Sequence, residues 1–272
     1  MDTFEREMTA DFDRLDALFN EDSSMVQGSA VSALTLEYPG LAVVASRSPA
    51  TRRPVLASII EKALTATDDA AKESVIVFAN ATKQLLMREV IAVASGVAFT
   101  ALDNANLADE DWPKLSHGAN LLCRLAGIEE QPSESDDAGH LKAKSRIQWS
   151  GNPVAVADVL RALSECGDGS TVIIENAHLL HGADRVSAAL SDLRNCAAAT
   201  GNFLYLGVGL SHWPDVRKSN NRELFLTDLP EAYADMVNIA DKILLLAPSS
   251  EGAEVTIFDP RYVEAWRGPL EF

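Results

Sequence analysis

The hydrophobic and polar positions of this chain form alternating blocks that predict strands followed by helices. Short runs that are apolar at nearly every position, at 41–45, 74–79 and 170–175, are typical of strands buried on both faces of a parallel sheet. Between these runs, apolar residues recur every three or four positions, which is the spacing of a helix that buries one face. The pattern therefore predicts an α/β fold with a mainly parallel sheet flanked by helices.

The same pattern continues towards the C-terminus and predicts the order of the remaining elements. Helices are expected to begin at Pro54 and to run over about 82–96, 107–126, 153–163 and 184–199, with a further helix within 224–241. Strands are expected over 147–149, 203–208, 242–247 and 253–258, and residues 268–272 end the chain on a short apolar piece. Pro153 is expected at the first position of its helix, where its missing N–H has no helical partner to lose.

A separate amphipathic helix is predicted over residues 1–25, before the main domain of residues 26–272. Its apolar residues repeat at intervals of three or four and form one stripe, which consists of Phe4, Met8, Phe12, Leu15 and Phe19. A stripe with this much aromatic surface needs a partner. The sequence leaves two alternatives open, in which the helix folds back on its own domain or docks on a neighbouring subunit.

The composition fits one sizeable globular domain with additions, since 47% of the 272 residues are hydrophobic. No apolar run approaches the ~18 residues of a membrane span, and the acidic N-terminus has no signal-peptide core, so we expect a cytoplasmic protein without membrane contact. The three cysteines form no CxxC pair, which favours reduced thiols in the core over disulfides or zinc. The five histidines show no ligand spacing, so no metal site is expected.

The formal net charge of −17 opposes nucleic-acid binding, but it is unevenly distributed. Residues 1–25 carry a net −6, and 129–137 carry a net −5 within a polar, acidic insertion at 127–145 whose role the sequence does not predict. The rest of the chain is only mildly acidic. A candidate single-stranded DNA contact is the loop 211–222, with Trp213, Arg217, Lys218 and Arg222, although a solvated surface loop is the simpler interpretation.

Residues 41–57 predict a strand, a polar turn and a helix, which is the arrangement that presents backbone N–H groups to phosphates. The chemistry of a phosphate loop is missing from the turn, because it has no glycine and because Arg52 and Arg53 stand where Lys and Ser/Thr are expected. Glu175, at the end of the strand 170–175, is the candidate for holding Mg²⁺ or its water shell. The alternative is that Glu175 merely caps its strand at the solvent edge.

In this order and at these spacings, the chain resembles the C-terminal, RecA-like motor domain of the DnaB replicative helicase family over nearly its whole length. The most specific similarity is at 102–115 (LDNANLADEDWPKL), which is similar to the family's LxTGxLTDEDWxxL. Residues 36–47 are similar to its LQPGDLIVVAARP, and 186–206 and 226–229 follow in the family's order. The resemblance implies a RecA-like P-loop NTPase fold without the family's N-terminal domain. It also implies that the helix 1–25 corresponds to the linker helix, which packs on the adjacent subunit of the hexameric ring.

The departures from the family concern its chemistry. Its phosphate loop, RPSMGKT, corresponds here to Arg47, Ser48, Pro49, Ala50, Thr51, Arg52 and Arg53. Thr51 puts a β-branched side chain where the backbone must approach a phosphate. Arg52 keeps a charge without the compact ammonium group, and Arg53 removes the hydroxyl that would bind Mg²⁺.

The residues that the family uses to activate water and to sense charge are altered as well. No acid remains at 79–82, where the family has its catalytic glutamate, and Glu175 replaces its aspartate. The family's glutamine falls near Gly209 and its arginine on Pro230, whereas Arg261 is similar to the arginine near the family's C-terminus. Each lost general base or metal contact is typically worth orders of magnitude in rate.

These observations predict a DnaB-like pseudo-helicase that is associated with DNA replication and does not hydrolyse ATP. Its partners are expected to be a replicative helicase ring or further copies of itself, and no cofactor is expected. The first alternative is a divergent ATP-dependent DNA helicase or translocase, which would use ATP and Mg²⁺ only if the phosphate loop is still competent. The second alternative is a protein that binds single-stranded DNA without turnover.

Overall fold

The computed structural model describes residues 34–65, 74–79, 83–125, 147–150, 154–182, 186–211, 224–249, 252–259 and 262–270. The chain divides into two units, Met1–Ala33 and Leu34–Phe272. The predicted helix of residues 1–25, with its stripe from Phe4 to Phe19, lies outside the described residues, as does the acidic insertion at 127–145. The following description concerns the second unit.

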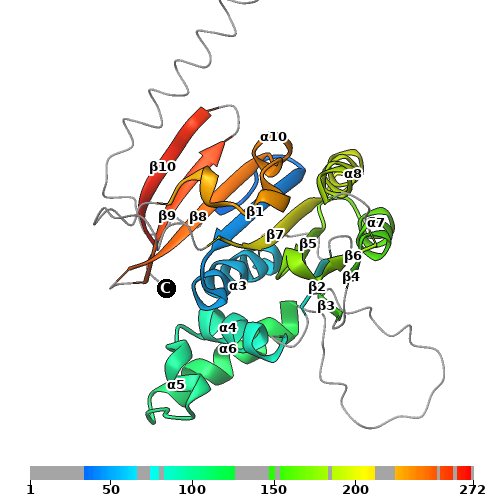
Figure 1. The fold of residues 1–272 in the computed structure, drawn as a ribbon. Helices are drawn as coiled ribbons and strands as arrows, with labels where there is room; N and C mark the ends of the chain where they lie inside the picture. The colour runs from blue at the N-terminus through cyan, green and yellow to red at the C-terminus, as the bar shows by residue number, and fades with distance from the viewer. Residues whose placement is uncertain are drawn as a thin grey trace, which may run out of the picture. The chain divides into compact units, whose positions relative to one another are not determined.

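An eight-stranded sheet forms the centre of this unit, in the strand order β10-β9-β8-β1-β7-β5-β2-β3 (Figure 1). Its strands are β1 (Gly40–Ser46), β2 (Val75–Phe78), β3 (Ile147–Ser150), β5 (Thr171–Ile174), β7 (Phe203–Gly209), β8 (Lys242–Ser249), β9 (Gly252–Asp259) and β10 (Tyr262–Leu270). The strands from β8 to β3 pair in parallel, whereas β9 and β10 add an antiparallel edge. The predicted α/β class with a mainly parallel sheet is confirmed.

Helices flank the sheet and join its parallel strands (Figure 1). The α-helices are α3 (Pro49–Thr65), α4 (Lys83–Ser95), α5 (Phe99–Asp103), α6 (Asp111–Leu125), α7 (Val156–Glu165), α8 (Val186–Ala199) and α10 (Met236–Ile239). Short 3-10 helices are η2 (Ala177–Leu179), η3 (Leu226–Asp228) and η4 (Glu231–Tyr233), and β4 (Val154–Ala155) pairs with β6 (Leu180–His181). Helix α3 packs on β1, β2, β5 and β8, and α4 and α6 form a further layer on α3.

The alternation of side chains along β1 accounts for the two apolar faces of the sheet. Leu41, Val43 and Ala45 belong to a core cluster that includes buried residues of α7 and α8. Ala42 and Val44 are equally buried, and because successive strand residues point to opposite faces they lie on the side of α3. A strand buried on both faces reads as a continuous apolar run, which explains why the sequence alone identified β1.

Several predicted boundaries were wrong. Helix α3 begins at Pro49, so Pro54 lies inside the helix and the turn after β1 is much shorter than predicted. Helix α7 begins at Val156, after the two-residue strand β4. Helix α5 and strand β10 were not predicted; β10 contains Pro269, which a strand at the edge of a sheet tolerates because the missing N–H breaks no inner ladder.

The cysteines are free thiols, and Cys166 and Cys196 pack against the core cluster, but the prediction that all three lie in the core was wrong for Cys123. Cys123 is exposed, and Cys166 and Cys196 are half-buried between α7 and α8. Among the described residues, no group of three or more His, Cys, Asp or Glu side chains could hold a metal ion. No described helix combines the length and the apolar character needed to cross a membrane.

Candidate functional site

The candidate site lies at the carboxyl ends of β1, β7 and β5, which are neighbours in the sheet. Ser46 at the end of β1 pairs in register with Gly209 of β7, and Ile174 of β5 pairs with Leu206. Only two residues separate the end of β1 from the start of α3. Parallel α/β proteins bind ligands at this edge of the sheet, beyond the carboxyl ends of the strands.

Arg52, in the first turns of α3, points into this edge instead of towards solvent. Its side chain is 1% exposed. Its Nε donates a hydrogen bond to the backbone oxygen of Glu175 at 3.2 Å, and its Nη1 donates to the backbone oxygen of Val208 at 3.0 Å and to Ser46 Oγ at 3.3 Å. One guanidinium therefore joins β1, β7 and the residue that follows β5.

Gly207 makes room for this arrangement, and the sequence analysis missed it. A Cβ atom at Gly207 would lie 1.9 Å from the backbone oxygen of Glu175 and 2.8 Å from Arg52 Nε. No side chain fits there, because a backbone atom on the next strand cannot move aside. The available signal was a glycine in the middle of an otherwise apolar strand, which often marks a close approach of another group.

Burial dominates the electrostatics of Arg52. It lowers the pKa of the guanidinium to about 10, while the charge of Glu175 acts in the opposite direction and that of Arg53 adds to the decrease. Arg52 therefore stays protonated at neutral pH. Glu175 is itself only 2% exposed, and its backbone N–H donates to Phe78 O at 3.0 Å.

The backbone donors at the start of α3 already have acceptors within their own turn. The Ala50 N–H donates to Ser48 Oγ at 3.2 Å, and the Thr51 N–H donates to Ser48 O at 3.1 Å. The hydroxyl of Ser46 also donates to Ser48 O, at 2.6 Å. A phosphate loop needs such N–H groups to point at the ligand, whereas here Ser48 accepts from two of them.

The other predicted site residues fall into three groups. Arg47, Ser48, Pro49 and Ala50 are exposed or half-exposed, whereas Arg53 is buried at the α3–α4 contact. Gly209 lies beside His178, since a Cβ there would be 3.1 Å from His178 Nε2, and Pro230 precedes η4. The DNA-contact candidates Trp213, Arg217, Lys218 and Arg222 lie outside the described residues, as does Arg261.

The structure has a mainly parallel sheet with helices on both faces and a strand–turn–helix unit at its centre (Figure 1), which is the α/β class that the sequence predicts. No protein-family model matches the sequence, and a search of the curated proteins finds no match. Among solved structures, the chain is similar to "ATPase Domain of G40P", with a TM-score of 0.64 at 16% identity, over 98% of this chain and 94% of that one.

A second similar structure is described as "The Structure Of A DnaB-Like Replicative Helicase And Its Interactions With Primase". Its TM-score is 0.61 at 19% identity, over 85% of this chain and 54% of that chain, so the match spans about half of the length of that helicase. The chain thus has the fold of a DnaB-like helicase ATPase domain. At these identities the likeness concerns the fold and not the activity.

Proposed function

We propose that this chain is a DnaB-like pseudo-helicase that does not hydrolyse ATP and acts in DNA replication by associating with a helicase ring or with copies of itself. The observation that carries the proposal is the buried guanidinium of Arg52. In a phosphate loop the cation at this position reaches the nucleotide. Here its Nε and Nη1 donate to three acceptors of the protein itself.

Breaking these hydrogen bonds so that Arg52 could bind a phosphate would cost a large amount of free energy. A hydrogen bond from a charged donor contributes roughly 1.5–3 kcal/mol, so turning Arg52 outwards would give up roughly 5–9 kcal/mol for three such bonds. A nucleotide bound with a Kd of about 1 μM gains about 8 kcal/mol. Because the two quantities are of the same size, opening the site would cancel most of the binding free energy.

Support for the interaction role is of a different kind. One of the similar structures is that of a DnaB-like replicative helicase, described together with its interactions with primase. The apolar stripe that runs from Phe4 to Phe19 is the segment that we expect to dock on a neighbouring subunit.

Two measurements test the proposal. Calorimetry and thermal shift with ATP and a nonhydrolysable analogue, each with and without Mg²⁺, should detect no binding up to millimolar nucleotide. Analytical ultracentrifugation and cross-linking, alone and with a purified DnaB-type helicase from the same host, should detect an assembly. A strict monomer that binds no helicase would contradict the interaction role.

The opposite result would favour one of the two alternatives. Mg²⁺-dependent nucleotide binding, with a DNA-stimulated ATPase that Glu175→Gln abolishes, would establish a divergent motor with Glu175 near the metal. Binding of single-stranded DNA that weakens steeply with salt, without ATPase, would establish DNA binding through the loop 211–222.

A further inference from the structure

A second group of charges lies away from the sheet edge, where α3, α4 and α5 meet. Glu89 of α4 is 4% exposed, and Arg53 of α3 is 9% exposed. The Nε of Arg53 is buried and has no hydrogen-bond partner among the described residues. At the rim of the cluster, Arg88 of α4 forms an ion pair of 2.6 Å with Asp103 of α5. The inner acid and the inner base are thus buried, while the outer pair is partly open to solvent.

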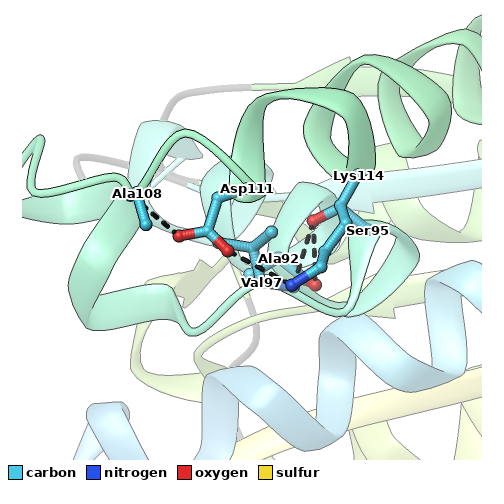
Figure 2. A network of polar contacts seen from close by, with 6 residues as sticks. All are labelled: Ala92, Ser95, Val97, Ala108, Asp111 and Lys114. Carbon is cyan, nitrogen blue, oxygen red and sulfur yellow. Dashed lines mark hydrogen bonds and ion pairs between the residues drawn. The ribbon is translucent and has the colours of Figure 1, made fainter.

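The charges around Glu89 come from the helices packed on α4. Burial raises the pKa of Glu89 to about 7, while Arg53 lowers it and Asp103 raises it further. From α6, Asp111 pairs with Lys114 at 3.3 Å and accepts the Ala108 N–H at 3.1 Å (Figure 2). The remaining titratable group of α6 with a described side chain near this end is His117, which is exposed.

The far end of α4 is tightly packed and has little room to move. A Cβ atom at Gly118 of α6 would lie 2.8 Å from the backbone of Ser95. The hydroxyl of Ser95 donates to Ala92 O at 3.2 Å and accepts the Val97 N–H at 3.4 Å (Figure 2). If the charge of Glu89 in the middle of α4 changes, we therefore expect the packing of α4 against α3 to adjust. The end of α4 that packs against Gly118 should stay in place.

We propose that Glu89 is a pH-sensitive latch between α3 and the layer of α4, α5 and α6, which holds this layer firmly when its carboxyl is protonated and loosens it when the carboxyl ionises. Burial costs the neutral carboxyl much less solvation free energy than it costs the carboxylate, which is an ion in a buried position. Arg53 attracts the carboxylate through space, but burial is the larger effect. This inference does not depend on the proposed function.

The direction of the pH dependence follows from proton linkage. A carboxyl whose pKa in the folded state lies above its ordinary value of 4.5 binds its proton more tightly in the folded than in the unfolded chain. The contribution of Glu89 to stability is therefore lost as the pH rises from about 4.5 to about 7. The whole effect is already present at pH 8.

Urea unfolding of the full chain at pH 5.5 and pH 8 tests the latch. Glu89→Gln removes the ionisation but keeps the size of the side chain. Between pH 5.5 and pH 8 the unfolding equilibrium constant of the wild type should therefore rise roughly thirtyfold more than that of Glu89→Gln, because about 1.5 pKa units of the shift from 4.5 to about 7 lie above pH 5.5. The matched control is Glu110→Gln, at an exposed position in the turn before α6, which should follow the wild type. Identical pH profiles of the wild type and Glu89→Gln would overturn the proposal.

A direct titration keeps the proposal testable if Glu89→Gln does not fold. Carbon-13 NMR of the glutamate carboxyls in the wild type should show one group that titrates near pH 7, and Arg53→Met should move its midpoint upwards because a nearby cation is lost. A Glu89 carboxyl that titrates near its ordinary value, or a midpoint that Arg53→Met leaves unchanged, would contradict the latch as described.

Discussion

At the scale of single residues, Arg52 illustrates how the environment of a side chain determines its role. The sequence predicts a phosphate-binding cation at this position, whereas in the structure the guanidinium is buried and donates to the carbonyls of Glu175 and Val208. Gly207 permits this because it leaves the space beside β5 empty. The same charge would act on a ligand if it pointed to solvent, and here it joins β1, β7 and the residue that follows β5.

The first prediction concerns the charge of Arg52. Arg52→Met should lower the free energy of unfolding by roughly 3–5 kcal/mol, because it removes the buried donor of the backbone oxygens of Glu175 and Val208. Urea unfolding followed by circular dichroism measures this loss. Arg161→Met is the matched control: Arg161 pairs with Asp158 on the surface, and such pairs are worth less than about 1 kcal/mol. Equal losses for both variants would contradict the stabilising role of Arg52.

The second prediction concerns the space at Gly207. Gly207→Ala should destabilise the protein by roughly 3 kcal/mol or more, since the added methyl would overlap the backbone oxygen of Glu175. Gly209→Ala, two residues further along β7, should be much milder because its nearest neighbour is the side chain of His178. Thermal unfolding of the two variants compares them. A Gly207→Ala protein as stable as the Gly209→Ala protein would show that β7 shifts freely.

At the scale of elements, ion pairs and hydrogen bonds fix how a helix meets the sheet. Arg194 of α8 contacts Asp241 through two bonds, from Nε to Oδ2 at 3.1 Å and from Nη2 to Oδ1 at 2.7 Å. Asp241 also accepts the Leu41 N–H at 2.9 Å. The hydrogen bonds that Arg194 donates to Asp241, and the negative charge of Asp241, raise the pKa of Arg194. One carboxylate thus joins α8, β1 and the start of β8.

The third prediction follows from this junction. Asp241→Ala should lower the free energy of unfolding by about 2–3 kcal/mol, because it removes three hydrogen bonds and leaves the Leu41 N–H without its acceptor. Asp158→Ala, which removes only the surface pair with Arg161, is the control and should cost less than about 1 kcal/mol. Urea unfolding distinguishes the two, and a loss at Asp241 no greater than that at Asp158 would refute the junction.

At the scale of the whole molecule, the chain shares the fold of DnaB-like helicase ATPase domains, while Arg52 at the sheet edge donates to acceptors of the protein itself. The proposed function therefore depends on whether the chain associates with a helicase ring or with copies of itself. The apolar stripe in residues 1–25 lies outside the described residues and stays a prediction.

The fourth prediction tests this stripe in the full chain. Phe12→Ser removes an aromatic from the centre of the stripe and should weaken association at least about tenfold, since a well-packed aromatic contributes over about 1.4 kcal/mol at an interface. Asp13→Ser changes the adjacent residue on another face of the predicted helix and should leave association unchanged. Sedimentation velocity over a range of concentrations measures both. Equal association of the two variants would favour a stripe that folds back on its own domain.

The sequence by itself determined the α/β class and the order of most elements, because strands buried on both faces and helices buried on one face leave different periods in the chain. It also located the strand–turn–helix unit. Only the tertiary structure decided that Arg52 turns inwards, that Gly207 makes room for it, and that Glu89 and Arg53 are buried between helices. These facts depend on contacts between segments far apart in the sequence, such as Arg52 and Glu175, and no local pattern carries that information.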